Sequence, residues 1–409
     1  MQFLWILIFA SFSLDAATLK ESFLAARKNM ESIKRAELNI LQKEERKNLA
    51  KSALLPNLNA FGTYTKIDPP NVNGGISVLT LKRQYNYGIR LTQPLIRGGV
   101  MGAFDFAKDD YLLSEFQKSA TELNLYQLVI NNFYNLKIAQ DDVKNLKRFL
   151  DYSKSRVKDI RARTNIGRSR RGELVEAEAQ LHVAESQYKE SMIGLKQLEE
   201  QYFFYTQTRP GMIADFSGIP QLNETLPSLL SKIQKRPDIL ATQQQVKTAE
   251  HQVTISKGGH YPTVDLVGNY YLDRTGALES SDWDAGIQVN IPIYLGGRVD
   301  ATTREAAAGK RIAELTSKEA ARNAEQEITV LFQNFKQLES QLKSQKQALS
   351  KSEEAYELNQ KDYQNGLVTN LDVLQSLNTF IQNKRAYDSL YSLTHMTHKN
   401  LEAAVGVLP

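Results

Sequence analysis

Histidine is the first residue type here that could do chemistry, because two imidazoles can share a metal ion. His395 and His398 are three positions apart in a stretch with helical spacing, so both side chains could face one ion. A closed zinc site needs about four ligands, and no further ligand accompanies this pair in the sequence. The absence of cysteine also excludes a thiolate metal site and a disulfide framework. We therefore predict no metal and no cofactor.

Paired glycines suggest a second chemistry, a backbone loop that cradles phosphate. Gly98–Gly99 follow Pro94 at the end of an alternating apolar and polar run. The sequence has no P-loop, no G-x-G-x-x-G that opens a helix, and no nucleophile elbow. The same arrangement recurs 198 positions later (292 − 94), where Gly296–Gly297 follow Pro292. The repetition favours a structural junction over a ligand loop, and we predict that the chain is not an enzyme.

Length and charge narrow the class of protein. The chain has 409 residues and a formal net charge of +5, without a basic block dense enough to indicate nucleic-acid binding. Residues 1–16 are largely apolar and end in small side chains, which is typical of a secretory signal peptide. This apolar stretch is shorter than the ~20 residues of a membrane-spanning helix. We predict cleavage after Ala16 and export.

The chain is a tandem duplication. We predict a first structural repeat over 17–209, a linker over 210–225 and a second repeat over 226–409. Landmarks 206 positions apart (262 − 56) connect "LPNLNAFGTY" with "YPTVDLVGNY", and landmarks 199 apart (366 − 167) connect Gly167 with Gly366. Units of this length are too long for solenoid repeats, whose periods run roughly 20–50 residues. Each repeat is therefore half of one molecule.

Each repeat contains two predicted strands, at 58–65 and 84–94 in the first and at 263–272 and 283–292 in the second. Tyr85, Tyr87, Ile89 and Leu91 alternate with small or polar residues, as in a half-buried strand. Two interpretations remain open. The apolar face could pack on a soluble core, or it could face lipid while the other face is wet.

The segments after the strands have helical periodicity. Apolar residues recur every 3–4 positions in register between the repeats, which predicts coiled-coil packing; they are Val129, Leu136, Ala139, Val143, Leu146, Leu150, Val157 and Ile160, then Ile328, Leu331, Phe335, Leu338, Leu342, Leu349 and Tyr356. A helix of ~60 residues from about 101 to 163 would be ~90 Å long, so we expect an elongated molecule. Tight turns at 165–172 and 365–371 reverse these helices.

Four strands cannot close a membrane barrel alone. The smallest such barrels have about eight strands. An open sheet in lipid would leave unpaired edges. Either the sheet is soluble and covered, or several chains pool their strands. Three chains of four strands would give twelve, with one interface used three times.

Five stretches together resemble the TolC family of outer-membrane efflux ducts: "LLPNL", "QPLIRGG", "RPDI" at 236–239, "IPIYLGG" and "NGLVTNLDVL". The resemblance covers essentially all of the mature chain. It implies a mainly α fold with β strands, in which a tandem-duplicated protomer trimerises into a 12-stranded membrane β-barrel continued by a long 12-helix periplasmic α-barrel. It also implies a location in the outer membrane of a Gram-negative bacterium.

The resemblance assigns roles to the two turns. Similar ducts place these hairpin tips at the periplasmic mouth, against an adaptor protein; the matching residues are Gly167, Glu173, Gly366, Leu367 and Thr369. Relatives often have two aspartates three residues apart at the pore entrance, where this chain has Asp372 and Gln375. One acidic ring would therefore survive in a trimer. A plain helix-hairpin turn also explains the two glycines.

Other tip residues carry further expectations. Arg168, Arg170 and Arg171 form a basic run. It is either a solvated turn, or it lines the pore entrance or pairs with an acidic adaptor surface. Tyr363 could donate a hydrogen bond to Glu173 and so link the two hairpins.

We predict a passive exit duct for efflux or type I secretion. The chain would assemble as a homotrimer in outer-membrane lipid. Its protein partners would be a periplasmic adaptor and an energising inner-membrane transporter of the RND or ABC type. The junctions at Pro94, Gly98, Gly99, Pro292, Gly296 and Gly297 would turn the chain from barrel strand to tube helix. The alternative is a secreted coiled-coil adhesin or scaffold that does not conduct.

Overall fold

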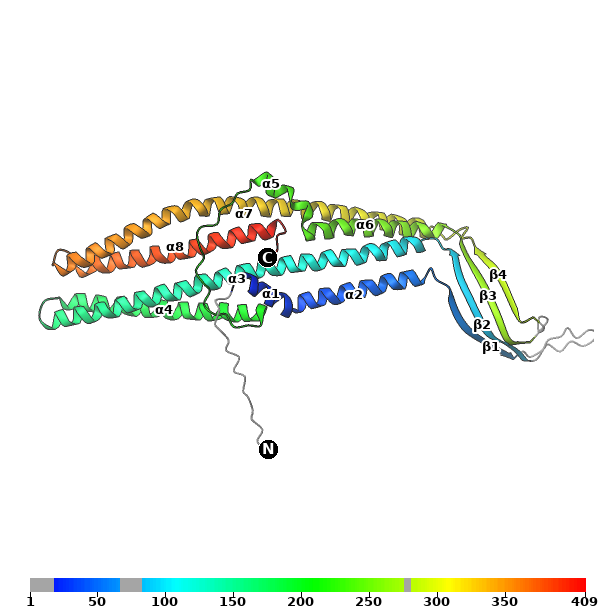
Figure 1. Ribbon diagram of the computed structural model, residues 1–409, viewed down its shortest axis with the longest axis horizontal. Helices are drawn as coiled ribbons and strands as arrows, with labels where there is room; N and C mark the ends of the chain where they lie inside the picture. The colour runs from blue at the N-terminus through cyan, green and yellow to red at the C-terminus, as the bar shows by residue number, and fades with distance from the viewer. Residues whose placement is uncertain (1–17, 67–82, 276–280) are drawn as a thin grey trace, which may run out of the picture. The chain divides into compact units, whose positions relative to one another are not determined.

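The computed structural model describes residues 18–66, 83–275 and 281–409, so the predicted signal peptide lies outside the described residues. The elements follow one another in the order helix, hairpin of strands, long helix and returning helix, and this order occurs twice (Figure 1). The elements are α1 (Leu19–Asn29), α2 (Glu31–Ser52), β1 (Asn57–Lys66), β2 (Arg83–Ile96), α3 (Val100–Asn165), α4 (Arg171–Thr206), α5 (Leu226–Ser231), η1 (Ile233–Lys235), α6 (Pro237–Lys257), η2 (Gly258–His260), β3 (Thr263–Arg274), β4 (Trp283–Asn290), α7 (Arg298–Gln364) and α8 (Asn370–Ala404).

Two compact units divide the chain, and each takes residues from both sequence repeats. The helical unit comprises Ser119–Pro237, Ala321–Pro409 and the described residues before Arg35. The sheet unit comprises the described residues of Arg35–Lys118 and Asp238–Ala320. Neither compact unit therefore coincides with one sequence repeat.

The sheet is antiparallel with the strand order β1-β2-β3-β4. Gly62 pairs with Tyr87 in the first hairpin, and Gly268 pairs with Ala285 in the second. These are equivalent pairs, because the two offsets are 206 (268 − 62) and 198 (285 − 87), as in the sequence. The duplication thus extends to the register of the strands.

The two faces of the sheet differ in character. Two aromatic pairs lie on the apolar face, where Tyr64 pairs with Tyr85 and Tyr270 pairs with Trp283. Exposed aliphatic side chains continue this face along the strands; they are Leu58, Ile89, Leu91, Leu266, Ile287 and Val289. The opposite face carries hydrogen-bonded polar groups, and Asn269 accepts from Arg90 Nε at 2.7 Å and donates to Asp284 at 2.7 Å.

The long helices α3 and α7 have 66 and 67 residues. Their length is possible because neither contains proline. The predicted seam positions are fully or partly buried, with Ile160, Ile328 and Phe335 fully enclosed. Ser153 interrupts the seam, and its buried hydroxyl donates to the carbonyl of Phe149 at 2.9 Å, which satisfies it locally.

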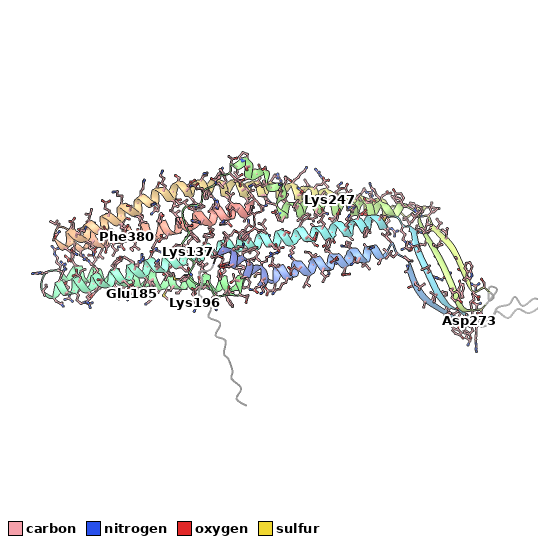
Figure 2. The ribbon with its side chains drawn as sticks, viewed as in Figure 1. Lys137, Glu185, Lys196, Lys247, Asp273 and Phe380 are labelled. Carbon is pink, nitrogen blue, oxygen red and sulfur yellow. The ribbon has the colours of Figure 1, made fainter. Side chains whose placement is uncertain are left out.

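Apolar packing joins the helices of the helical unit. One cluster combines α1, α3, α4 and the carboxyl end of α8, with Phe23, Tyr126, Phe133, Tyr202 and Ala403 among its members. Nearer the turns, a second cluster joins α3, α4 and α8. Phe380 on α8, labelled in Figure 2, lies beside it. Its ring stacks on that of Tyr356 of α7, with 6.0 Å between ring centroids. The two helical hairpins are thus packed together within one chain.

Candidate functional site

Both hairpin tips are built by the same backbone motif. Gly167 and Gly366 have φ of +73° and +76°, in the left-handed region that favours glycine. The N–H of Arg168 donates to the carbonyl of Arg163 at 2.8 Å, and the N–H of Leu367 donates to that of Asp362 at 2.9 Å. These are the six-to-one bonds of a Schellman motif, which closes a helix on a glycine. The glycines are therefore explained by the turn itself.

The second tip has a complete capping box. Thr369 precedes α8 and its hydroxyl accepts from the N–H of Asp372, while the Asp372 carboxylate accepts from the N–H of Thr369 at 2.8 Å and from its hydroxyl at 2.6 Å. These donors lower the pKa of Asp372, with the side-chain bond from Thr369 the larger cause. The side chain is exposed, so the tip presents a fixed, ionised carboxylate to solvent.

Asp372 and Gln375 border an open groove beside the second tip. The groove has a volume of about 630 Å³ and lies along α7 and α8, with Asn359, Leu367 and Thr379 also in its wall. Leu367 is 73% exposed, and Gln375 is exposed as well. Both predicted entrance residues therefore share one accessible surface.

The first tip is basic. Arg168, Arg170 and Arg171 are exposed, and none of the three makes an ion pair within the described residues. Arg170 occupies the position before α4 without a side-chain cap, and Glu173 accepts from the hydroxyl of Ser169 at 2.6 Å instead. The two tips thus share a backbone turn but differ in charge.

The predicted hydrogen bond from Tyr363 to Glu173 is not formed within the described chain. Tyr363 is only 9% exposed, and its ring lies beneath the guanidinium groups of Arg156 and Arg163, with centroid distances of 3.9 and 4.8 Å. Glu173 is engaged by Ser169 in its own turn. The ring prefers the two cations on α3 to a carboxylate on α4. Sequence reasoning missed Arg156 because the residues that it contacts are about 200 positions away.

The junction residues differ between the two repeats. β2 continues past Pro94 to Ile96 through a register shift, so Pro94 does not end its strand as we expected; a bulge tolerates its missing N–H. β4 ends at Asn290, before Pro292. Gly98 lies so close to Gly258 that a Cβ on it would overlap the Gly258 carbonyl.

The second junction has no such neighbour. Gly296 and Gly297 have φ of +63° and +77°, and no other atom comes within 4 Å of a Cβ built on either within the described chain. The tyrosine beside them, Tyr294, is 85% exposed, and Ile293 is 95% exposed. Gly98 therefore serves close packing and Gly99, with φ of +82°, serves both packing and the turn, whereas Gly296 and Gly297 serve the turn.

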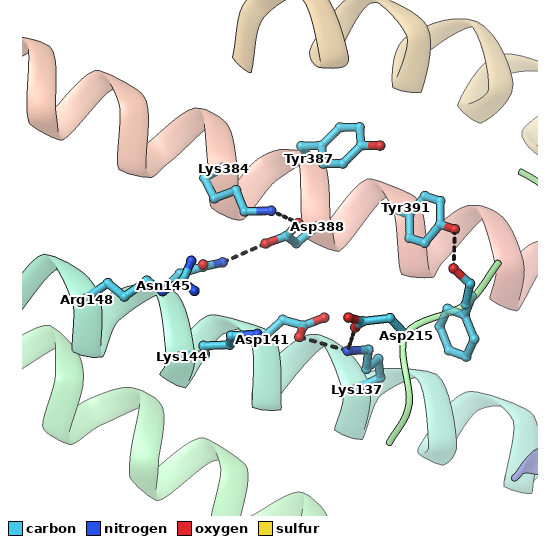
Figure 3. A pocket seen from close by; sticks show the side chains of 11 residues that line it. Lys137, Asp141, Lys144, Asn145, Arg148, Asp215, Lys384, Tyr387, Asp388 and Tyr391 are labelled. Carbon is cyan, nitrogen blue, oxygen red and sulfur yellow. Dashed lines mark hydrogen bonds and ion pairs between the residues drawn. The ribbon is translucent and has the colours of Figure 1, made fainter. Parts of the chain in front are cut away.

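The linker between the repeats is fastened to α3 and α8 (Figure 3). Lys137 donates to Asp215 of the linker at 2.6 Å and to Asp141 at 2.9 Å, and Tyr391 donates to the carbonyl of Phe216 at 2.8 Å. His395 bonds the carbonyl of Gly218 at 3.0 Å through Nε2, and burial lowers its pKa. The histidine therefore holds the linker as a neutral donor.

In the described ranges, no three His, Cys, Asp or Glu side chains gather at one point where they could hold a metal ion. None of the helices described for this chain combines the length and apolar character of a membrane-spanning helix.

Comparison with known proteins gives one family. A family model described as outer membrane efflux protein matches residues 24–192 and 229–407. The chain is 27% identical over 302 residues to the outer membrane efflux protein BepC of Brucella suis biovar 1, which covers 70% of this chain and 63% of BepC, so the match spans less than two thirds of that relative. It is 21% identical over 381 residues to the outer membrane protein TolC of Vibrio cholerae, with 88% and 84% of the two chains covered.

The fold agrees with this. The Campylobacter jejuni CmeC outer membrane channel superimposes with a TM-score of 0.84 over 96% of this chain and 86% of that chain, at 17% identity. The predicted fold class, a tandem-duplicated protomer of the TolC type, is confirmed by this likeness and by the repeated order of helices and strands.

Proposed function

Because the chain belongs to the outer membrane efflux protein family, we propose that three copies form a passive outer-membrane exit duct for efflux or type I secretion. The observation that carries this proposal is the four-stranded sheet, whose exposed apolar face has two cross-strand aromatic pairs. Lipid-facing barrels have an apolar band bordered by aromatic girdles and a polar inner face. A soluble sheet would instead cover that apolar face.

The sheet edges favour assembly from several chains. Among the described strands, β1 and β4 each have one partner, so each keeps one unpaired edge. Backbone groups cannot stay unpaired in lipid. Pairing β4 of one copy with β1 of the next satisfies both edges, and three copies close a ring of twelve strands.

The two junctions support the same assembly. Gly98 and Gly99 pack on Gly258 within one chain. The residues equivalent to Gly258–Gly259 in the first repeat are Ser52–Ala53, at the offset of 206 (258 − 52). Small side chains at these positions could receive Gly296–Gly297 of a neighbouring copy in the same way. The exposure of Ile293 and Tyr294 beside this junction fits a surface that another copy covers.

The hairpin tips are the proposed adaptor contacts and pore entrance. The exposed leucine at the second tip, Leu367, and the unpaired arginines at the first provide apolar and cationic contacts for a partner surface. The chain has no P-loop to bind ATP. An inner-membrane transporter would therefore supply the energy, coupled to the duct through the periplasmic adaptor.

Fractionation and conductance test the duct together. The expected result is a protein that stays with the outer membrane, needs detergent for extraction, runs as a trimer and conducts ions in planar bilayers. A monomer in the soluble periplasm would defeat the proposal. A membrane-bound trimer without conductance would favour the alternative, a coiled-coil scaffold.

Charge reversal tests the adaptor contact. Replacing Arg168, Arg170 and Arg171 by Glu should reduce adaptor crosslinking and export, because like charges would then face an acidic adaptor. The matched control replaces the same three by Lys and keeps the charge. Unchanged crosslinking and unchanged export in the Glu variant would contradict a role for this basic run.

A further inference from the structure

One exposed guanidinium lies on the polar face of the sheet, which is the face opposite Leu58 and Ile89. Nε of Arg90 on β2 donates to Oδ1 of Asn269 on β3 at 2.7 Å, and the guanidinium carbon lies 4.9 Å from the ring centroid of Phe61 on β1. Within the described residues, its Nη atoms make no hydrogen bond and the side chain forms no ion pair. An amide and a ring thus position this side chain while its Nη donors stay available to a ligand.

The carboxylate that accompanies Arg90 is already covered by donors. Asp284 of β4 accepts from Nδ2 of Asn269 at 2.7 Å and from the hydroxyl of Tyr271 at 2.6 Å, and Nη1 of Arg274 lies 3.6 Å from it. Two arginines and one aspartate give this hydrogen-bonded cluster a net charge of +1 per chain (2 − 1). Because the negative charge is engaged and the Nη donors of Arg90 are not, the cluster can attract an anion.

Two aromatic rings lie beside the guanidinium. Phe61 of β1 and Tyr271 of β3 both pair with Gly88 of β2, which has no side chain to separate them. Their rings meet edge to face, with 5.9 Å between centroids and an interplanar angle of 89°. Both residues are partly exposed. An aromatic surface and a cation therefore lie side by side on three neighbouring strands.

This combination of groups suits an aromatic anion. The fork of a guanidinium binds the oxygens of a carboxylate, phosphate or sulfonate with paired N–H donors. Contact between aromatic rings adds attraction for a flat apolar group. An inorganic anion would use the cation without the rings, and a neutral aromatic compound would use the rings without the cation. A ligand that has both a ring and a negative charge uses the whole site.

The duplication does not repeat this site. The five equivalent positions, at offsets of 198 and 206, hold neither a charge nor a ring; they are Gln288, Val267, Thr63, Thr65 and Asn86. These residues would meet where β4 of one copy pairs with β1 of the next. The site therefore occurs once per chain, on the strands that pair within the chain.

We propose that Phe61, Arg90 and Tyr271 form a binding site for aromatic anions on the polar face of the sheet. In the proposed duct this face lines the passage, so three such sites would surround it and favour anionic aromatic cargo. The place of the site in a passage rests on the proposed function, whereas ligand binding does not depend on transport. Asn269 is a positioning residue, because it holds Arg90 and is itself held by Asp284.

Pyranine, a water-soluble sulfonated pyrene dye, tests the site in the detergent-extracted full-length protein. Fluorescence anisotropy should show saturable binding to the parent. Arg90→Gln should weaken binding roughly tenfold to hundredfold, as expected for a hydrogen bond to a charged group. Phe61→Val should weaken it roughly two- to tenfold, as expected for one aromatic contact. Each substitution introduces the residue that the other repeat has at the equivalent position, so we expect the strands to remain paired.

Two controls separate this site from general attraction of a dye. Arg83→Gln removes a cation from the same strand but on the face of Tyr85, since alternate residues share a face, and it should leave the affinity unchanged. Naphthalene disulfonate should displace pyranine at a lower concentration than propane disulfonate, which has the same charge but no ring. The melting temperature of each variant identifies any that fails to fold.

Four outcomes would overturn the site: no saturable binding to the folded parent, parent-like affinity in folded Arg90→Gln or Phe61→Val, equal loss of affinity in Arg83→Gln and Arg90→Gln, or equal displacement by the two disulfonates. Single-channel recording then tests the consequence for transport. Pyranine should block the parent more strongly than Arg90→Gln, and the reversal potential of that variant should shift toward cation preference. Equal block of both channels would contradict a site in the passage. Binding through Arg90 in a parent that does not conduct would count against the duct alone.

Discussion

Asp372 and Thr369 bind each other reciprocally at the start of α8, with the carboxylate receiving both the N–H and the hydroxyl of the threonine. The same carboxylate is the one acidic group predicted for a ring at the pore entrance. Its capping role fixes the side chain in one geometry and keeps it ionised. A structural contact and a proposed functional charge therefore reside in one residue.

Replacing Asp372 and Thr369 separately distinguishes these two roles. Asp372→Asn should reduce the preference of the channel for cations, since rings of charge set ion selectivity. Thr369→Ala removes the cap but keeps the carboxylate, so it should lower stability and leave selectivity near that of the parent. Reversal potentials in asymmetric salt measure the first effect and urea unfolding the second. Equal ion selectivity in both variants would show that the Asp372 carboxylate does not line the pore entrance.

The cap also predicts a pH dependence of stability. Because the pKa of Asp372 is lower in the folded state, its contribution is fully present above the ordinary aspartate value, about 3.9, and disappears as the pH falls through the lowered folded value. Urea midpoints measured between neutral and acid pH should therefore converge for Asp372→Asn and the parent at the acid end. A constant difference across that range would contradict the linkage.

Glycine substitutions test the tip turns. Gly366→Ala places a Cβ at φ +76° and should destabilise by about 1–2 kcal/mol. Gly172→Ala is the control, because Gly172 lies within α4 and, like Gly366, has free space around an added Cβ. It should be neutral or stabilising by up to about 1 kcal/mol. Similar unfolding midpoints for the two variants would show that backbone conformation does not decide the cost.

Lys137 should matter more than its partner in the linker. Its side chain is 6% exposed and neutralises Asp141 as well as Asp215, whereas Asp215 is 86% exposed. Lys137→Met should cost about 3 kcal/mol because it leaves the half-buried carboxylate of Asp141 unpaired. Asp215→Asn should cost less than about 1 kcal/mol. Chemical unfolding measures both, and equal costs would be inconsistent with a role for Asp141.

Lys137 and Asp141 also give a pH test, in which the pKa of the carboxyl is shifted in the opposite direction to that of Asp372. Burial raises the pKa of Asp141 in the folded state, which means that folding disfavours its charged form. Without Lys137 this penalty grows, and protonation removes it. The stability deficit of Lys137→Met should therefore shrink as the pH falls through the raised pKa and be largest at neutral pH.

Local periodicity predicted much of the fold. The buried seam of α3 and α7 was readable because Ile160 and Ile328 belong to a 3.5-residue pattern that both repeats share. The family resemblance is confirmed, and so is the fold class. The turn glycines were readable too, because a Schellman motif is local. Features that depend on a few consecutive turns of the chain can be predicted from the sequence.

Contacts between distant segments left no such mark. The contacts of Arg156 were missed because the ring and the amide that it touches lie 207 or more positions along the chain from it (363 − 156) and follow no local pattern. For Gly98, the close approach to Gly258 was equally hidden, although the double glycine at 258–259 was a usable signal. The linker contact of Lys137 likewise joins residues 78 positions apart. Tertiary packing decides such sites.

The internal duplication predicts the register between neighbouring chains. Within one chain Arg90 of β2 pairs with Asn269 of β3. The residue of β4 equivalent to Arg90 is Gln288 (90 + 198), and the residue of β1 equivalent to Asn269 is Thr63 (269 − 206). The duplication therefore places Gln288 of one copy opposite Thr63 of the next. Because a slip of one residue would turn every apolar side chain toward the wet face, the register should be strict.

Cysteine pairs measure that register directly in this cysteine-free chain. Thr63→Cys combined with Gln288→Cys should form disulfide-linked dimers and trimers under mild oxidation, visible on non-reducing gels. The controls combine Thr63→Cys with Gly286→Cys or with Asn290→Cys, which lie on the same face but two residues out of register. Diagonal neighbours on adjacent strands, two residues out of register, are roughly 7 Å apart. This distance exceeds the Cβ separation of about 4 Å that a disulfide allows. Preferential crosslinking in a control pair would refute this register while leaving a trimer intact, whereas crosslinking in none of the three would count against edge pairing between β4 and β1.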